Sequence, residues 1–275
     1  MRALDILMRD PRHGQILALS CLIGAGVLAL SWEMPLWRPV TAISAALAVQ
    51  ALASWIVKVP FDWRSPLITA GSLTLLLRTD GPALLLLAAS LAIASKFLFR
   101  VRGRHIWNPA ALAIVAVTAA APGAWVSPGQ WGTEAWVILA AAGLGTLVTG
   151  RARRAEVPLL FLAAWAGLSV GRALWLGDPM AVPLHQLQSG ALIVFAFFMI
   201  SDPMTQPWHP GARAAWIGLV AALGFALQHA WIVDAGPLWG LVLAAPLVPL
   251  FDRLLPHPSA AWRPTAPRPS TGVPA

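Results

Sequence analysis

Ten apolar segments follow one another along the chain, and they constrain its fold more than any other feature. None shows the strict polar–apolar alternation of a membrane β-barrel, so each segment is expected to form a helix. Hydrophobic residues make up 58% of the sequence and charged residues only 11%, too few to cover a water-soluble surface. The chain is therefore predicted to be an all-α polytopic integral membrane protein. The segments lie at about 15–32, 40–57, 67–77, 83–99, 109–121, 134–148, 157–175, 187–200, 212–229 and 236–251.

The placement of the basic residues predicts the topology. If the N-terminus is cytoplasmic, sixteen of the 19 lysines and arginines fall on the inner side of a ten-span chain, and only Arg38, Arg78 and Arg172 fall outside. Cytoplasmic loops of membrane proteins carry such an excess, so we expect a multi-pass protein of the cell membrane with both termini in the cytoplasm. The net charge of +8 then reflects topology and contact with anionic lipid headgroups, and it indicates no nucleic acid partner.

The third and eighth segments are too short for ordinary membrane-spanning helices, which need about 20 residues. "TAGSLTLLLRTDGP" (69–82) and "QSGALIVFAFFMISDP" (188–203) each join small residues to an apolar stretch and an aspartate close to a proline. With five spans per half, the second half would enter the membrane from the opposite side. This pattern predicts two inverted five-helix repeats, about 15–121 and 134–252, whose short broken helices three and eight mark a binding site. Two ordinary helices that end at turns are the alternative.

A single membrane domain is expected over residues 1–255. The start, "MRALDILMRDPRHGQ", is too polar for a signal peptide, so the first helix is expected to stay attached. The segment 256–275 is rich in proline and is expected to be disordered.

A basic stretch before the fifth segment is the first candidate for binding. Arg102, Arg104 and His105 precede Asn108, which can cap the helix that Pro109 would begin. A helix N-terminus beside guanidinium groups is a suitable place for a phosphate, and a protonated histidine would help to neutralise it. An ordinary cytoplasmic loop that obeys the positive-inside rule is the alternative.

Acidic residues at the ends of apolar segments are the second group of candidates. Asp202, with Ser201 and Thr205 beside it, ends the short eighth segment and is either a site residue or a structural cap. Asp252 ends the tenth segment and is expected to pair with its neighbour Arg253 at the membrane interface.

Metal, haem and cysteine chemistry have little support in the sequence. The lone Cys21 excludes an internal disulfide and an iron–sulfur cluster held by this chain alone. His185 and His229 could in principle ligate a haem, but both fall at the ends of segments, so a structural role is favoured. No cluster of metal ligands is found in the sequence.

Three stretches resemble a known family of membrane redox proteins. "FFMISDPMTQP" (197–207), "GRHIWNPAALAIV" (103–115) and "LAAPLVPLFDRL" (243–254) are similar to motifs of the D-type component of Rnf electron-transport complexes and the B-type component of the sodium-pumping NADH:quinone reductase. "DPRHGQI" (10–16) and "RVRGRHIWNP" (100–109) are closer to the stand-alone UnbU-like branch. The resemblance implies ten helices in two inverted five-helix halves.

The resemblance also implies a flavin. In the redox complexes, such subunits carry an FMN attached through its phosphate to a threonine in the outer loop after helix five. Here that loop, "APGAWVSPGQWGTEAW" (121–136), has Ser127 and Thr133 but no attachment motif around them, so covalent threonyl-FMN is not predicted. A non-covalent flavin, FMN or riboflavin, lodged among the helices is expected instead.

By resemblance, the chain is expected to be a membrane subunit of a flavin-dependent electron-transport system that passes electrons to partner subunits or a quinone. The sequence shows no nicotinamide-binding glycine-rich turn, so the electron donor would be another protein. Two rival functions remain. One is a small-molecule transporter, for which broken helices are equally typical, and the other is a non-catalytic assembly subunit of a biosynthetic complex.

The family fold would bring the inner ends of helices five and eight together. Asn108, Ser201 and Thr205 would then donate to a flavin ring or its polar head, and Arg104 would bind an anionic group. Asp202 would orient the loop or accept from a ring N–H. Loss of Arg104 or of Asn108 is accordingly expected to weaken cofactor binding while leaving the fold intact, and loss of Asp202 is expected to harm both.

Overall fold

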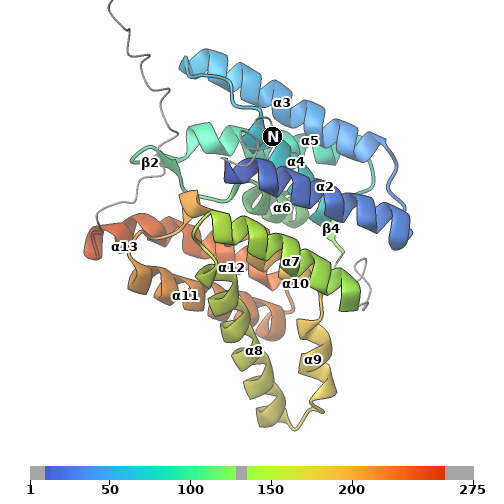
Figure 1. Ribbon diagram of the computed structural model, residues 1–275, viewed down its shortest axis with the longest axis vertical. Coiled ribbons are helices and arrows are strands. Elements are labelled where there is room, and N and C mark those ends of the chain that lie inside the picture. The colour runs from blue at the N-terminus through green and yellow to red at the C-terminus, as the bar shows by residue number, and fades with distance from the viewer. Residues whose placement is uncertain (1–9, 128–134, 258–275) are drawn as a thin grey trace, which may run out of the picture.

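The computed structural model describes residues 10–127 and 135–257, and most of this part is helical. The first half of the chain lies in the upper part of Figure 1, coloured blue to green. Its elements are α2 (Pro11–Ala29), α3 (Trp37–Val57), α4 (Arg64–Leu76), β1 (Leu77–Thr79), α5 (Pro82–Leu98), β2 (Arg100–Val101), β3 (Arg104–His105), α6 (Pro109–Ala120) and β4 (Ala124–Val126).

The second half lies in the lower part of Figure 1, coloured light green to red. Its elements are α7 (Ala135–Arg151), α8 (Glu156–Leu176), α9 (Ala181–Leu187), α10 (Gly190–Val194), the π-helix η2 (Phe195–Met199), the 3₁₀ helix η3 (Pro203–Thr205), α11 (Pro210–Ala230), α12 (Gly236–Ala244), the 3₁₀ helix η4 (Ala245–Leu247) and α13 (Val248–Leu254).

Several helices begin at a proline that follows a capping residue. The predicted cap at Asn108 is confirmed, since its side-chain oxygen accepts from the backbone N–H of Ala111 at 3.0 Å. Asp10 and His209 cap α2 and α11 in the same way. Each cap satisfies an N–H group that has no partner in the first turn, and the proline that follows has no N–H to satisfy. These local signals fix where the helices start.

The same packing order occurs in both halves. In the first half α3 packs against α5, and α5 against α6; in the second, α8 packs against α11, and α11 against α12. The short α4 lies against α2, and α10 lies against α7. Across the boundary α2 packs against α7, and α6 against α12. Two five-helix repeats would produce this order, while the inverted relation between them stays a prediction.

Every predicted apolar segment coincides with a helix, but fewer helices are long enough to cross a bilayer alone. Among the described residues, five helical runs have the length and hydropathy of a span, and the pair α9 and α10–η2, bent by 50°, would make a sixth. The helices α5 and α6 are apolar but shorter. The protein is thus a multi-pass helical membrane protein.

The count of ten spans and the cytoplasmic position of both termini stay predictions. The predicted disorder of the tail falls almost entirely on 258–275, outside the described part.

Neither of the two short segments is α-helical to its end: the first ends in a β-strand and the second in a π-helix. After α4 the chain forms β1, which pairs antiparallel with β4 so that Leu77 lies opposite Val126. Arg38, expected in an outer loop, is instead buried at the start of α3 and donates to the carbonyl of Leu77. The eighth segment continues from α10 into η2. The all-α prediction is therefore incomplete, because a backbone that leaves its helix inside the protein must find other hydrogen-bonding partners.

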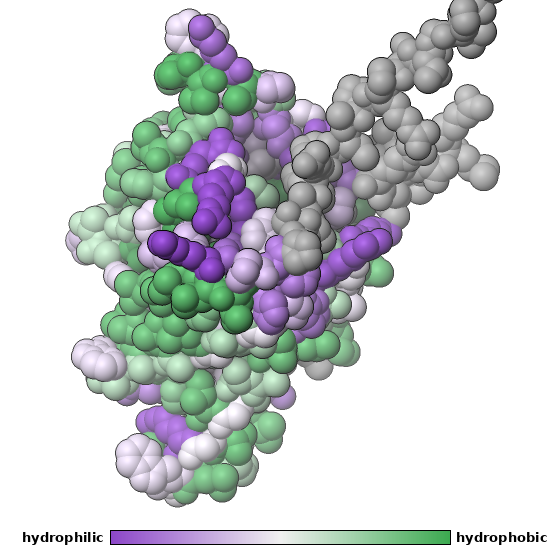
Figure 2. All heavy atoms as spheres, turned by 90° about the vertical axis from the view of Figure 1, so that its left-hand side faces the viewer, coloured by the Kyte–Doolittle hydropathy of each residue, from purple (hydrophilic) through white to green (hydrophobic). Residues whose placement is uncertain are grey.

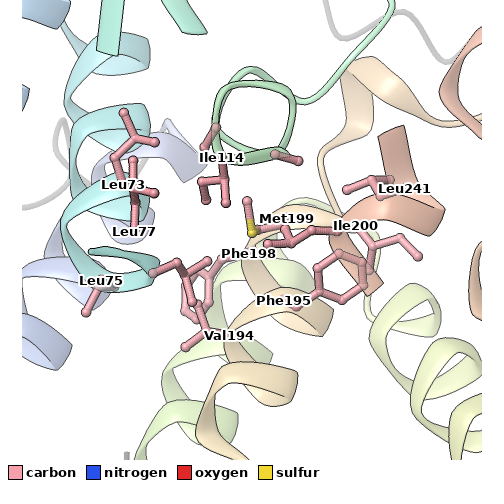
Figure 3. Packing of buried hydrophobic residues seen from close by; sticks show 14 of the residues in the cluster. Leu73, Leu75, Leu77, Ile114, Val194, Phe195, Phe198, Met199, Ile200 and Leu241 are labelled. Atoms are coloured by element: carbon pink, nitrogen blue, oxygen red, sulfur yellow. The ribbon is translucent and has the colours of Figure 1, made fainter. Parts of the chain in front are cut away.

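The core lies where the two short segments meet. Figure 3 shows side chains from α4 and β1 packed against those of α10 and η2, with α6 and α12 closing the cluster. Both segments are almost fully buried here, so the broken helices form the centre of the molecule. The cluster includes Leu73, Leu77, Ile114, Met199 and Leu241.

One face of the protein is distinctly hydrophilic. Figure 2 shows the side on which β2 and α13 lie in Figure 1, with hydrophilic side chains gathered across its middle and hydrophobic ones on either side. This arrangement suits a face that meets water and headgroups, flanked by surface that meets lipid. We call it the basic face; the hairpin that begins with β2 exposes Arg100 and Arg102 there, and α13 exposes Arg253.

Candidate functional site

The structure brings six of the seven predicted site residues together at the basic face. Arg104 and His105 form β3, Asn108 caps α6, and the other three, Ser201, Asp202 and Thr205, lie between η2 and the end of η3. We call this group the basic-face cluster.

Arg102 does not join the basic-face cluster. It lies in the turn between β2 and β3, where its φ of 50° and the φ of 82° at Gly103 give the left-handed backbone of a tight hairpin. Its side chain is exposed to solvent.

Side chains of the cluster, together with that of the neighbouring Gln206, donate to the carbonyl groups at the end of η2. Asn108 donates through Nδ2 to the carbonyl of Met199 at 3.3 Å, and Gln206 donates through Nε2 to that of Ile200 at 2.6 Å. The hydroxyl of Ser201 donates to the carbonyl of Phe197. A helix that ends inside the protein leaves its last carbonyls short of backbone partners, and that of Met199 has only a long one, the Asp202 N–H at 3.4 Å. The donors predicted to bind a flavin therefore serve the broken helix itself.

Arg104 joins the two halves of the chain. Its Nε donates to the carbonyl of Met204 at 2.9 Å, and Nη1 forms an ion pair of 2.9 Å with Asp252. Nη2 donates to the carbonyl of Gln206, and the guanidinium lies 4.2 Å from the ring centroid of Trp208. All three guanidinium nitrogens thus have partners in the second half. Nη1 and Nη2 each keep a second N–H, so the predicted anion site stays a prediction.

Asp252 also differs from its prediction. It pairs with Arg104 rather than with the adjacent Arg253, and its other oxygen accepts from the backbone N–H of Trp208 at 2.8 Å. Arg253 is exposed. Sequence proximity suggested the wrong partner, because side chains of neighbouring helical residues point in different directions.

Asp202 takes the structural-cap role that the sequence left open. Its Oδ1 accepts from the backbone N–H of Met204 at 2.9 Å, and its Oδ2 lies 3.5 Å from Nε2 of His105. Burial raises the pKa of Asp202, but the hydrogen bond and charge of His105, the Met204 N–H and the charge of Arg104 outweigh it and lower the pKa below its ordinary value. The carboxylate therefore stays ionised within the cluster.

Asp202→Asn is expected to make the protein less sensitive to acid. Because the folded pKa is depressed, the stability that Asp202 contributes is present above its ordinary pKa of about 3.9 and is lost as the pH falls through the lower folded value. Thermal midpoints of the protein in nanodiscs, measured between about pH 6 and pH 3, should fall further for the wild type than for the variant. Equal losses would show that Asp202 contributes nothing to this dependence.

Sequence reasoning missed Gln206 as a member of the cluster. Its side chain is almost fully buried at 1% exposure, and its Oε1 has no hydrogen-bond partner in the described structure. The signal was available, because a glutamine three residues after Pro203 can turn back onto a helix end that the proline has stopped.

A cavity of about 580 Å³ lies on the opposite side of the protein from the basic face, beside β4 and α9. The break between α9 and α10 forms one wall, and the end of α11 with the start of α12 forms another. None of the predicted site residues lines it. Residues that do include Trp165, Gln186, Gln188, Phe195, Gln228 and Asp234.

The fold and the cluster define a multi-pass helical membrane protein built around a broken helix whose end is capped from both halves. Comparison with known proteins makes this class more specific. A sequence model described as the NQR2, RnfD, RnfE family matches residues 125–259, the segment that contains the broken helix, α11 and α12. This segment of the chain is therefore similar to that family.

Curated relatives point to the same family. The chain is 31% identical over 123 residues to the D-type component of the ion-translocating oxidoreductase complex of Citrobacter koseri, and 32% identical over 123 residues to that of Escherichia coli O1:K1. Each match covers 45% of this chain and 34% of the relative. The matched region is thus about a third of the length of these relatives. Placement in the UnbU-like branch stays a prediction.

Proposed function

We propose that the chain is a membrane subunit of a flavin-dependent electron-transport complex that relays electrons to partner subunits or a quinone. The observation that carries this proposal is the family match over residues 125–259, since the matched relatives are named as subunits of an ion-translocating oxidoreductase complex. The flavin would supply the redox chemistry, and the protein would bind it, orient it and exclude water.

The flavin of this proposal is held without a covalent bond. Of the two hydroxyl residues in the outer loop, Ser127 follows β4 and Thr133 lies outside the described residues. Neither stands in an attachment motif. In the basic-face cluster the three nitrogens of Arg104 bind protein groups, which leaves a phosphorylated flavin only the second N–H of Nη1 and that of Nη2. The proposed flavin is therefore better placed among the helices, away from the basic-face cluster.

Purified protein in nanodiscs tests the proposal. We expect a flavin absorption band that bleaches on reduction with dithionite, and release of the flavin into the supernatant when the protein is precipitated with acid. A pigment that stays with the precipitate would contradict non-covalent binding. Colourless protein would reject flavin-dependent electron transport, and substrate flux into liposomes would then identify a transporter.

The proposed orientation places the basic face in the cytoplasm, with both termini on that side. Reporter fusions after Arg153, between α7 and α8, and after Asp178, between α8 and α9, should read cytoplasmic and external respectively. The two loops lie at opposite ends of α8, which is long and apolar enough to cross the membrane. If both fusions report the same side, the proposed topology is wrong.

A further inference from the structure

Two of the three arginines predicted to lie outside come together in the structure. Arg38 is at the start of α3, and Arg78 is in β1, which pairs with β4 on the side opposite the basic face (Figure 1). Arg38 donates to the carbonyl of Leu77, the residue before Arg78. Basic residues are scarce at the outer ends of membrane helices, so two of them at one strand indicate a specific role.

The guanidinium of Arg38 is a buried charge without a counter-ion in the described structure. Arg38 is only 4% exposed, and its Nε has no hydrogen-bond partner among the described residues. The acidic residues nearest in sequence to the two arginines, Glu33 and Asp80, are exposed. No carboxylate of the described residues forms an ion pair with Arg38. Because arginine stays protonated and a buried ion requires a partner, the counter-charge must come from outside this part of the chain.

The surroundings of Arg38 add positive potential. Arg78 is half-buried, its guanidinium lies 5.9 Å from the ring centroid of Trp32, and the positive charges of the two arginines repel each other. Arg38 also stands in the first turn of the 21-residue helix α3, whose N-cap residue Leu36 offers no side-chain hydrogen bond. The N-terminus of a long helix carries a partial positive charge of its own. Three sources of positive charge thus meet at one point.

The third of these arginines shows what a locally satisfied charge looks like. Arg172, near the end of α8, forms an ion pair of 3.2 Å with Asp178 in the loop that follows. The sequence supplies a carboxylate within one or two turns of Arg172 but none that reaches Arg38. Arg172 is therefore a matched control for an anion site at Arg38.

The residues around the start of α3 have the character of a membrane interface. Leu36 and Val40, on either side of Arg38 in sequence, are 81% and 62% exposed, and Trp125 of β4 is exposed as well. Exposed aliphatic side chains suit contact with acyl chains, and tryptophan is enriched at the depth of the headgroups. Phosphate esters of lipids are the anions found at that depth.

We propose that the start of α3 and β1 form a site for a phosphate oxyanion, with Arg38 as its principal ligand. A planar guanidinium can donate two parallel hydrogen bonds to two oxygens of one phosphate, and Arg78 adds a second positive charge. The phosphate belongs to the headgroup of an anionic phospholipid or is free in solution, and the exposed Leu36 and Val40 favour the lipid. This site is separate from the redox role proposed above.

Titration of the delipidated full chain in mild detergent with phosphatidylglycerol or inorganic phosphate tests the inference. Native mass spectrometry counts bound lipid, and thermal midpoints report stabilisation by either ligand. In Arg38→Gln, whose amide can still donate to Leu77, the tightest binding should weaken about ten- to a hundredfold, the loss of charge-assisted hydrogen bonds. Without added anion this variant should unfold no earlier than the wild type, because an unpaired buried charge has been removed. Arg172→Gln should respond to the ligands as the wild type does.

The outcomes separate the two sources of phosphate from a purely structural arginine. An Arg38-dependent response to phosphatidylglycerol alone identifies the lipid, and an equal response to inorganic phosphate identifies a free anion. Lipid bound at the basic face is common to all variants, so the difference between variants reports this site. Arg38→Gln that is less stable without anion and gains as much from both ligands as the wild type would show that Arg38 only supports β1. If Arg38→Gln does not fold, Arg38→Lys keeps the charge without the planar fork, and its binding phosphatidylglycerol as tightly as the wild type would equally overturn the site.

Discussion

Replacing Arg104 by alanine is expected to destabilise the protein by about 3 kcal/mol, the lower end of the cost of breaking a buried ion pair from one side, because this pair is partly buried. The side chains of Arg104 and Asp252 are only 13% and 11% exposed, so the substitution leaves a carboxylate without its counter-charge in a largely dry environment. It also removes the donors to two backbone carbonyls of the second half. Unfolding in mixtures of mild detergent and SDS measures the loss. This expectation replaces the sequence-based one, in which the fold would survive the change.

Two variants make the Arg104 experiment decisive. Arg102→Ala, in the exposed turn of the same hairpin, should change the free energy of unfolding by no more than about 0.5 kcal/mol. Adding Asp252→Asn to Arg104→Ala should recover part of the loss, because the unpaired charge is removed. If Arg104→Ala is as stable as Arg102→Ala, the ion pair does not hold the two halves together.

Asn108→Ala is expected to cost about 2–4 kcal/mol, because one side chain performs two tasks. Its oxygen caps α6 and its amide donates to the buried carbonyl of Met199. Asn108→Ser separates the two tasks, since a serine hydroxyl can cap the helix but is too short to reach η2. The serine variant should recover about 1 kcal/mol of the loss in the same unfolding measurement. Equal stability of the alanine and serine variants would show that the cap contributes nothing.

The parts of the fold that local sequence determines were predictable. Asn108 before Pro109 and Asp202 before Pro203 combine a side-chain acceptor with a residue that lacks an N–H, and both act as caps in the structure. The apolar segments likewise coincide with helices, because a membrane leaves an apolar chain few other ways to satisfy its backbone. These signals depend on residues only a few positions apart.

Contacts between distant residues were not predictable in the same way. The strand that follows α4 exists because Leu77 meets Val126, and nothing in either short stretch identifies its partner. The partner of Arg104 at Asp252 lies 148 positions along the chain. The sequence therefore showed which polar residues lie near the basic face but not that they bind one another. It also gave no sign of the cavity, whose lining residues come from α4, from β4 and from the segment between α8 and α12.

The capping of η2 by Asn108 has a consequence for the order in which the protein is made. The donor belongs to the first half, and its own conformation is fixed locally by the cap on α6, so it is in place before the ribosome reaches the eighth segment. The first half can thus act as a template on which the later broken helix completes its hydrogen bonds as it leaves the translocation channel. A second half synthesised alone would lack the Asn108 donor, so the Met199 carbonyl would keep only its 3.4 Å hydrogen bond from the Asp202 N–H, and supplying the first half on a separate chain should restore the missing donor.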